Sequence, residues 1–186
     1  MEPVIERGLI DRIRSGEPDA FAELLRQYQQ TVHSLIFQVV SSREDAEELT
    51  QDVFVKAYQK INSFRGESAI STWLYRIAYN TAISAIRRKK PLFLYLDEKP
   101  INEIPDELVD EVLNCDQDEK LLQSLQQAIG KLDPEEKALI SLYYTQGRPL
   151  KEIAEITKLT EGNVKIRLFR ARKKIVFIIK QAHNEG

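Results

Sequence analysis

Apolar side chains recur at three- and four-residue spacing along almost the whole chain. The clearest case is a stripe in the second predicted helix, formed by Phe21, Leu24, Leu25, Tyr28, Val32, Leu35, Ile36 and Val39. This spacing places apolar groups on one face of an α-helix, whereas a half-buried strand would alternate with a period of two. Because no convincing run alternates in that way, the pattern predicts an all-α protein.

Helix start and stop signals divide residues 1–90 into four helices. The segment 15–18 contains glycine and proline and is expected to end a short first helix. Asp19 is then placed to cap the second helix, and Ser42 with Asp45 resembles a capping pair for the third. A fourth helix is expected from about residue 71 to residue 90. Four helices in a domain of this length predict a compact bundle.

The helical pattern weakens between residues 91 and 117, where prolines and carboxylates interrupt the apolar stripe. We interpret this segment as an acidic linker, and a solvated tether without a partner is the simplest view of it. A second domain is expected at 118–186, where the Asp-Pro-Glu-Glu run at 133–136 gives a strong helix start. Gly147 is expected to end that helix, and Thr160 is expected to cap the last one.

The net charge of −2 conceals an uneven distribution along the chain. Residues 1–90 carry +1, residues 91–120 carry −8 and residues 121–186 carry +5. The acidic middle therefore masks a basic C-terminal part. Asymmetry of this kind predicts separate modules with separate partners.

Composition excludes several functional classes. The longest apolar runs, such as 175–179, are far shorter than a membrane span, and the acidic start lacks a secretion signal, so we expect a cytoplasmic protein without membrane insertion. Cys115 is the only cysteine, and with only His33 and His183 beside it no disulfide or metal cluster is expected. The sequence also lacks a phosphate-binding glycine loop and a nucleophile–base pair. We therefore expect no enzyme, no cofactor and no small-molecule substrate.

One face of the third predicted helix carries acidic groups. Asp45, Glu48 and Asp52 follow one another at three- and four-residue spacing and therefore share a face. A face of this kind is often simply solvated. The alternative is a docking surface for a basic partner, in which Gln51 and an exposed Phe54 add polar and apolar contacts. Periodicity alone leaves both interpretations open.

The fourth predicted helix combines aromatic, amide and cationic side chains. It contains Tyr75, Arg76, Tyr79 and Asn80, and the basic run 87–90 follows them. Unpaired bases stack on aromatic side chains, whereas the bases of a duplex hide their faces from the protein. The pattern therefore predicts a surface for an opened nucleic-acid strand, on which the Asn80 amide is able to read a base edge.

A helix-turn-helix is predicted near the C-terminus. A short helix at 150–156, a turn and a longer helix that begins at about residue 161 have the length and apolar spacing of this motif. Side chains near the start of the second helix would reach the major groove: Thr160, Glu161, Asn163, Lys165 and Arg167. Basic groups further along suit phosphate contacts: Arg170, Arg172, Lys173 and Lys174. An ordinary helical hairpin with a basic surface is the remaining alternative.

Together these segments resemble the extracytoplasmic-function (ECF) group of the bacterial sigma-70 family. The resemblance rests on residues 19–21 (Asp-Ala-Phe), the acidic helix 45–54, the segment 71–80 and the terminal helix-turn-helix, and it covers nearly the whole chain. It implies that a sigma-2-like four-helix bundle binds bacterial core RNA polymerase and opens the −10 promoter element. It implies that a sigma-4-like domain binds the −35 element as duplex. An anti-sigma factor is an expected partner, which could hold the protein at the inner face of the membrane.

The resemblance also implies roles for particular residues. Polymerase contacts are expected from Asp45, Glu48, Gln51, Asp52 and Phe54. Contacts to the −10 strand are expected from Phe64, Arg65, Tyr75, Arg76, Tyr79, Asn80, Arg87 and Arg88. Contacts to the −35 duplex are expected from Thr160, Glu161, Asn163, Lys165, Arg167, Arg170 and Arg172. The acidic linker would run toward the RNA path near the active centre of the polymerase and act there as a nucleic-acid mimic.

Three positions depart from the family pattern. Ser84 stands where aspartate is frequent, Lys158 stands where the turn usually has glycine, and Asn163 stands where threonine is usual. A positive φ at Lys158 would be unfavourable because the residue has a Cβ atom. Two other functions remain compatible with the sequence: a conventional helix-turn-helix regulator of palindromic duplex DNA, and an adaptor protein that binds no DNA.

Overall fold

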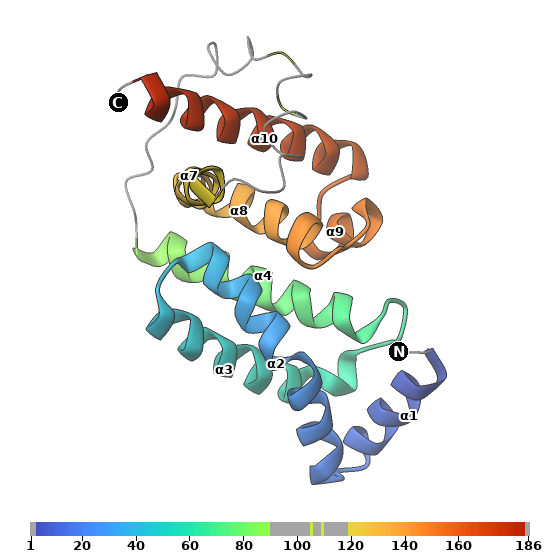
Figure 1. The fold of residues 1–186 in the computed structure, drawn as a ribbon. Helices are drawn as coiled ribbons and strands as arrows, with labels where there is room; N and C mark the ends of the chain where they lie inside the picture. Colours follow the sequence, from blue (N-terminus) through green and yellow to red (C-terminus); the bar gives the residue numbers. More distant parts are fainter. Residues whose placement is uncertain (1–2, 90–104, 106–108, 110–118, 185–186) are drawn as a thin grey trace.

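The computed structural model describes residues 3–89, 105, 109 and 119–184. Every regular element in these residues is helical, which confirms the predicted all-α fold (Figure 1). In chain order the elements are α1 (Pro3–Arg14), α2 (Pro18–Val40), α3 (Arg43–Lys60), the 3₁₀-helix η1 (Ile61–Ser63), α4 (Ile70–Lys89), α7 (Glu119–Gly130), α8 (Pro134–Ile140), the π-helix η2 (Ser141–Thr145), α9 (Leu150–Thr157) and α10 (Glu161–Asn184). Within those residues, none of the helices has the length and apolar character needed to cross a membrane. The acidic linker predicted at 91–117 lies outside the described residues, apart from positions 105 and 109.

The start of α3 agrees with the sequence prediction, and the start of α2 does not. Ser42 caps α3, and its Oγ accepts a 3.2 Å hydrogen bond from the backbone N–H of Asp45. For α2, the N-cap is Glu17, and Pro18 occupies the first helical turn. Proline is favoured there because it lacks the N–H that would have no partner within the helix. The prediction that Asp19 is the cap is therefore wrong, since this residue lies inside the first turn, where its charge is favourable for the helix dipole.

The helices of the C-terminal domain, α7 to α10, begin at or next to the predicted residues, but the helix expected to reach Gly147 consists of α8 followed by the π-helix η2. Asp133 and Glu136 form a complete capping box at the start of α8, in which Asp133 Oδ1 accepts from the Glu136 N–H at 2.8 Å. Gly147 follows the π-helix with a φ of 60°. The Thr160 hydroxyl accepts a 3.2 Å hydrogen bond from a backbone N–H in the first turn of α10. Lys158 ends α9 with a φ of 59°, so this departure from glycine does adopt the left-handed conformation.

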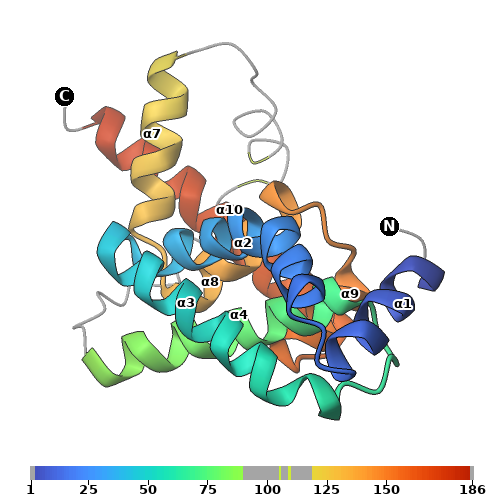
Figure 2. The same cartoon turned by 90° about the horizontal axis from the view of Figure 1, so that it is seen from below.

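Each domain is organised around one long helix. In the N-terminal domain, α1 to α4, the helices α1, α3 and α4 all pack on α2. The centre of its predicted stripe is fully buried, including Leu24, Val32 and Leu35. Burial of each such side chain contributes about 1.5–3 kcal/mol, so the stripe determines which face of α2 the other helices cover. In the C-terminal domain α7, α8 and α9 pack on α10, and α7 crosses it (Figure 2).

The two domains pack directly on each other. Helix α4 lies along α9, and α2 contacts α8. Figure 1 shows α4 between the rest of the N-terminal bundle and the pair α8 and α9. Apolar side chains of both domains belong to one continuous core. The helix predicted to hold an opened strand therefore lies at a domain junction.

Candidate polymerase and nucleic-acid interfaces

The acidic face of α3 consists of Asp45, Glu48, Gln51 and Asp52. Glu48, Gln51 and Asp52 are exposed, as a docking surface requires. Asp45 is partly exposed and forms a 2.6 Å ion pair with Lys89 at the end of α4. The hydrogen bond from Lys89 lowers the pKa of Asp45, so this carboxylate remains ionised at neutral pH. The face thus presents negative charge to solvent. Its helix, α3, is held in place because it packs against both α2 and α4.

The prediction that Phe54 is exposed is wrong. Only 4% of its surface is accessible, because it lies beside Val53 and widens the buried stripe of α3. Phe54 lines an apolar groove between α2 and α3, away from solvent. The exposed apolar side chains of this groove are Val55 and Tyr58, and the Tyr58 ring packs edge-on against Phe21 at a centroid distance of 5.0 Å. Val55 and Tyr58 therefore supply the apolar surface that sequence reasoning assigned to Phe54.

Three aromatic side chains predicted to meet an opened strand are buried in this structure. Tyr75 has 1% of its surface exposed, and Tyr79 and Phe64 are also buried. Phe64 packs on Trp73 with ring centroids 5.3 Å apart, so it belongs to the core. Burial also raises the pKa of Tyr79, which lies near charged groups of the C-terminal domain. The prediction of an exposed aromatic surface is wrong for this arrangement, because the segment before α9 covers Tyr75 and Phe64 packs on Trp73.

Two residues of the C-terminal domain, Gln146 and Arg148, contact Tyr75. Its hydroxyl donates a 2.9 Å hydrogen bond to Gln146 Oε1. The guanidinium carbon of Arg148 lies 4.9 Å from the centroid of its ring, which is the range of a cation–π contact. The same guanidinium donates to Ser71 Oγ at 3.4 Å and to Glu152 Oε2 at 3.3 Å. Both the polar end and a face of Tyr75 are therefore in contact with protein.

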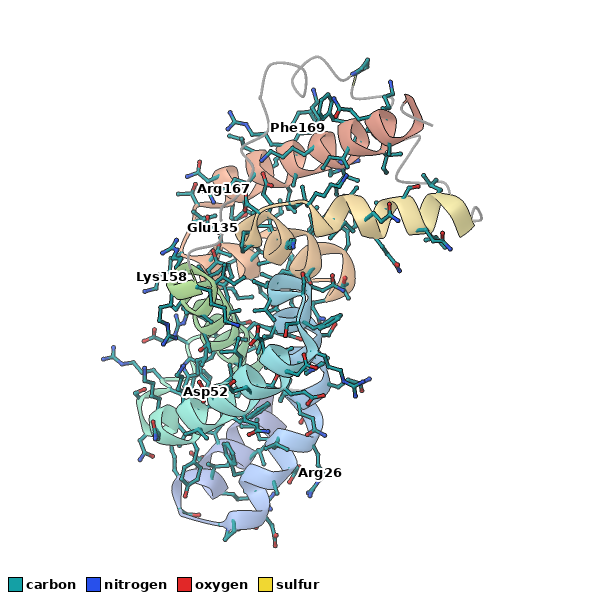
Figure 3. The ribbon with its side chains drawn as sticks, turned by 90° about the vertical axis from the view of Figure 1, so that its left-hand side faces the viewer. Arg26, Asp52, Glu135, Lys158, Arg167 and Phe169 are labelled. Atoms are coloured by element: carbon teal, nitrogen blue, oxygen red, sulfur yellow. The ribbon has the colours of Figure 1, made fainter. Side chains whose placement is uncertain are left out.

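Glu135 of α8 joins two arginines that the sequence assigns to different promoter elements. Its Oε1 accepts from Arg87 Nη2 of α4 at 2.8 Å, and its Oε2 accepts from Arg167 Nη1 of α10 at 2.7 Å. Figure 3 shows Glu135 beside Arg167 at the domain junction. Burial alone raises the pKa of Glu135, but the hydrogen bonds from both arginines outweigh burial, and the pKa lies below its usual value. An ionised carboxylate thus connects α4 to α10.

Further polar contacts cross the same junction. Thr72 Oγ1 of α4 donates to Glu152 Oε2 of α9 at 3.3 Å, and Lys137 Nζ of α8 donates to Ser41 Oγ, which follows α2, at 3.3 Å. Burial lowers the pKa of Lys137. Each of these contacts is long, so none of them alone holds the domains together strongly. In the described parts of the chain, no group of histidine, cysteine and carboxylate side chains is placed to bind a metal ion.

A basic hollow of about 560 Å³ lies beside α4. Its lining consists of Lys56, Lys60, Ser63, Trp73, Arg76, Ile77, Asn80, Thr81, Ser84 and Lys158. Asn80 Nδ2 donates to the Arg76 carbonyl at 2.8 Å, which orients the amide along the helix. Because Ser84 replaces a frequent aspartate, this position adds no negative charge to the hollow. Arg65 and Arg88 are exposed on the N-terminal domain. Several −10 candidates thus remain accessible while the tyrosines are covered.

Helix α10 presents most of the predicted −35 side chains to solvent. Exposed are Thr160, Glu161, Asn163, Lys165, Arg167 and Arg170, whereas Arg172 is half-buried. Sequence reasoning missed two apolar residues of this helix, Ile166 at 52% exposure and Phe169 at 37%. Figure 3 labels Phe169 on α10. The Lys173 ammonium lies 4.7 Å from the Phe169 ring centroid. The sequence does contain a signal for the exposure of Ile166 and Phe169. Both lie outside the buried stripe of Val164 and Leu168, and an apolar side chain outside the stripe is exposed.

Comparison with known proteins agrees with this order of segments. Residues 24–91 match sigma-70 region 2, and residues 122–175 match sigma-70 region 4. The chain is 37% identical to the ECF RNA polymerase sigma-E factor of Haemophilus influenzae, over 94% of this chain and 95% of that protein. It is 34% identical to the ECF RNA polymerase sigma factor SigW of Bacillus subtilis, over 93% of this chain and 95% of that protein.

Two solved structures share the fold. CnrH, in complex with the cytosolic domain of CnrY, gives a TM-score of 0.67 at 22% identity and covers 95% of this chain and 97% of its own. The sigma factor RpoE of Bartonella quintana, in complex with the anti-sigma factor NepR, gives 0.63 at 22% identity and covers 86% of this chain and 96% of its own. Identity this low supports the helical two-domain fold alone. The sequence relatives span nearly all of the chain at higher identity, and they establish that it belongs to the ECF group of sigma-70 family RNA polymerase sigma factors.

Proposed function

We propose that this chain is an alternative sigma factor that binds core RNA polymerase, recognises −35 and −10 promoter elements, and melts the promoter to start transcription. The observation that carries this function is the presence of segments matching regions 2 and 4 in one chain whose relatives are ECF sigma factors along almost their whole length. These relatives argue against a conventional regulator of palindromic DNA and against an adaptor that binds no DNA. A sigma factor acts by binding energy and catalyses no reaction of its own.

The acidic face of α3 is the proposed contact with core polymerase. Glu48, Gln51 and Asp52 are exposed on one side of a well-packed helix, and Asp45 is oriented by its ion pair with Lys89. A rigid negative surface favours a partner with basic side chains, and complementary charge speeds association as well as selecting the partner. Val55 and Tyr58 next to this face offer the apolar contact that such an interface requires.

Helix α4 and the basic hollow beside it are the proposed contact with the opened −10 strand. Tyr75 and Tyr79 would stack on unpaired bases once the C-terminal domain no longer covers them, and Asn80 would read a base edge. Unstacking costs a few kcal/mol per base, and stacking on an aromatic side chain returns roughly 1–3 kcal/mol. Captured bases can therefore offset much of the cost of melting when polymerase holds the strands. Arg76 and the lysines of the hollow suit the phosphates.

Helix α10 is the proposed contact with the −35 duplex. Lys165 and Arg167 lie exposed near its start, where a recognition helix meets base edges, and Arg170 suits phosphate contacts. Ile166 and Phe169 are exposed on the same helix, and apolar groups in the major groove favour the methyl group of thymine. Affinity and sequence preference would thus come from different side chains of one helix.

An anti-sigma factor is the proposed regulator. CnrH was solved with the cytosolic domain of CnrY, and the Bartonella quintana sigma factor was solved with the anti-sigma factor NepR. By analogy with these proteins of the same fold, a partner would cover the polymerase and DNA surfaces of this chain until a signal arrives. The site of action would be the cytoplasm, and a membrane-anchored partner would hold the protein at the inner membrane face.

Run-off transcription tests the proposed function. Bacterial core polymerase is incubated with a genomic fragment library, with and without this protein, and the 5′ ends of the transcripts are mapped. We expect discrete new starts that share two upstream elements. The same reaction with Asp52→Lys is the control and is expected to give none of them. The absence of new starts with folded protein and active core from the matching host would contradict the function.

A further inference from the structure

We propose that Arg14, in helix α1, is a positioning residue for the −10 strand, because it fixes the loop 64–69 that carries Arg65. The inference rests on the proposed sigma function, in which Arg65 contacts the opened strand. It goes beyond that function because α1 precedes the segment 24–91 that matches region 2, and α1 supplies none of the proposed promoter contacts. Arg14 acts through the loop and not by touching DNA.

Helix α1 packs at the corner where this loop begins. Leu9, Ile10 and Ile13 are buried and belong to the same core as Ile61 of the 3₁₀-helix η1. The helix contacts both α2 and η1, and Figure 2 shows it beside the connection from α3 to α4. The last turn of α1, which contains Arg14, is therefore held next to the residues that follow η1.

The Arg14 guanidinium is hydrogen-bonded to the loop. Its Nη2 donates to the carbonyl oxygen of Phe64, which is 50 positions later in the chain. Its Nη1 lies 3.6 Å from Asp11 Oδ1, one turn earlier on α1, so this carboxylate helps to orient the guanidinium. A hydrogen bond from a charged donor is roughly twice as strong as a neutral one. Arg14 thus connects α1 to the start of the loop.

A fixed carbonyl at Phe64 also fixes the residue that follows it. The peptide group is planar, so the Phe64 carbonyl and the N–H and Cα of Arg65 lie in one plane. The Phe64 N–H donates to the Ile61 carbonyl at 3.1 Å, and its ring packs on Trp73. The contact with Arg14 adds the constraint that sets the direction in which the chain leaves Phe64 toward Arg65.

The exposed part of the loop depends on this anchor. Arg65, Gly66 and Glu67 are exposed, and Gly66 has a φ of 71°, which glycine adopts without strain. Exposed segments with few buried contacts are the first to move locally. The loop, Trp73 and Arg76 line a hollow of about 260 Å³. A displacement of the loop therefore moves Arg65 relative to Arg76, a second −10 candidate on the same hollow.

Positioning has a different signature in DNA binding from charge. A cation that meets a phosphate raises the affinity for every sequence alike. A residue that positions a base contact changes the ratio of the affinities for right and wrong bases. This ratio is also unaffected by a change in the folded fraction, which lowers both affinities equally. The base preference at the −10 element is therefore the quantity that tests the role of Arg14.

The first test measures this preference in the polymerase complex. Core polymerase with wild-type protein or with Arg14→Met transcribes a promoter found by run-off mapping, and templates with each single base change in its −10 element. A wrong base at a specific position typically lowers affinity by about fivefold or more. We expect Arg14→Met to reduce the preference at one or more −10 positions by about threefold or more, with core binding unchanged. Arg14→Lys keeps the charge and a donor, and should retain more of the preference.

Arg12→Met is the matched control. It removes the same charge from the same helix, but the Arg12 guanidinium pairs with Glu17 at 2.7 Å and with Glu23 at 3.2 Å. This variant should keep the wild-type base preference. An unchanged preference in folded Arg14→Met, or an equal change in both variants, would overturn the proposal. Absence of transcription with the wild-type protein would count against the sigma function itself.

The second test follows the loop without DNA or polymerase. Trp73 is the only tryptophan in the chain, and it is 6% exposed beside Phe64. Acrylamide is a neutral quencher, so its access to Trp73 reports how well the ring is covered. We expect quenching to rise by about twofold in Arg14→Met and to remain at the wild-type value in Arg12→Met. Equal quenching in wild type and Arg14→Met would show that the loop does not depend on Arg14, and would overturn the proposal whatever the transcription result.

Discussion

The acidic face of α3 and the face of α4 proposed for the opened strand belong to the same protein but differ in their exposure to solvent. Glu48 and Asp52 are open to solvent, and nothing in the C-terminal domain pairs with them among the described contacts. Tyr75 is buried, and Arg87 and Arg167 are both bound to Glu135. The surface proposed for polymerase is therefore accessible, whereas Tyr75 is buried and the exposed side chains of Arg87 and Arg167 are each paired with Glu135.

This difference implies an order of events. A free sigma factor with open DNA surfaces would bind nonspecific DNA, which is present in large excess, through its basic groups. A free factor with an open acidic face and covered tyrosines meets polymerase first. Negative charge on that face also repels DNA, which reinforces the same order. Variants on either surface test this order of events.

Asp52→Lys is expected to have the largest effect. Reversal of an exposed charge at the centre of a complementary interface costs several kcal/mol, so affinity for core polymerase should fall by about 100-fold or more. Fluorescence polarisation of the labelled protein with core polymerase measures this change, and circular dichroism should be unaltered because the side chain is exposed. Glu47→Lys on another side of α3 is the matched control. Wild-type affinity of the Asp52 variant would remove the docking role of the acidic face.

Arg167→Ala is expected to have the second largest effect. Loss of a base-edge contact costs roughly 1–3 kcal/mol, so a polymerase complex with this variant should bind −35 duplex about tenfold more weakly while its assembly with core is unchanged. Lys180→Ala near the other end of α10 removes the same charge and should have little effect. An equal loss of polymerase binding and duplex binding would contradict the division of labour between the domains.

Glu135→Gln tests the contact of Glu135 with Arg87 and Arg167. The neutral amide cannot maintain both ion pairs. The free protein should therefore show lower energy transfer between dyes attached to α2 and α10, and several-fold tighter binding to single-stranded DNA. Glu155→Gln on the exposed side of α9 changes the net charge equally and is the control. Tighter binding by both variants to the same extent would show that net charge, and not the bridge, is responsible.

The pKa of Glu135 predicts how this bridge responds to pH. Because its folded-state pKa lies below the ordinary value of 4.5, the contribution of the bridge is fully present above that value and is lost as the pH falls through the lower folded pKa. Energy transfer between the domains should therefore be constant from about pH 8 to about pH 5. A midpoint within that range would assign the opening to another titrating group.

Much of the fold could be predicted because its signals are local. The stripe of α2 and the caps Ser42, Asp133 and Thr160 depend on neighbours a few residues away. Phe54 and Asp19 were misjudged for local reasons too. A helix stripe can be one residue wider than the minimum, and a proline can begin a helix two residues earlier than a plausible cap suggests.

Local sequence signals could not predict which residues of the candidate site are buried or paired. Tyr75 and Gln146 are 71 positions apart, and Arg87 and Glu135 are 48 positions apart. The aromatic and basic pattern of α4 predicts a surface for an opened strand, but whether this face is exposed depends on where a second domain packs. Glu135 carries no sequence signal beyond its place in the acidic first turn of α8, although it connects α4 to α10.

The cap of α8 offers the smallest and most local test, because this helix carries Glu135 in its first turn. Asp133→Ala removes the side chain that accepts from the Glu136 N–H and should lower the free energy of unfolding by about 1 kcal/mol. Fraying of that turn should also loosen the contacts of Glu135 with Arg87 and Arg167 and reduce energy transfer slightly.

Asp133→Asn keeps an equivalent cap and should preserve both stability and energy transfer. Asp19→Ala at the wrongly predicted cap should change stability by a few tenths of a kcal/mol at most. Urea denaturation of the three variants measures the differences. Equal losses for Asp133→Ala and Asp133→Asn would show that the charge of Asp133, including its 3.9 Å contact with Lys174, matters more than the cap.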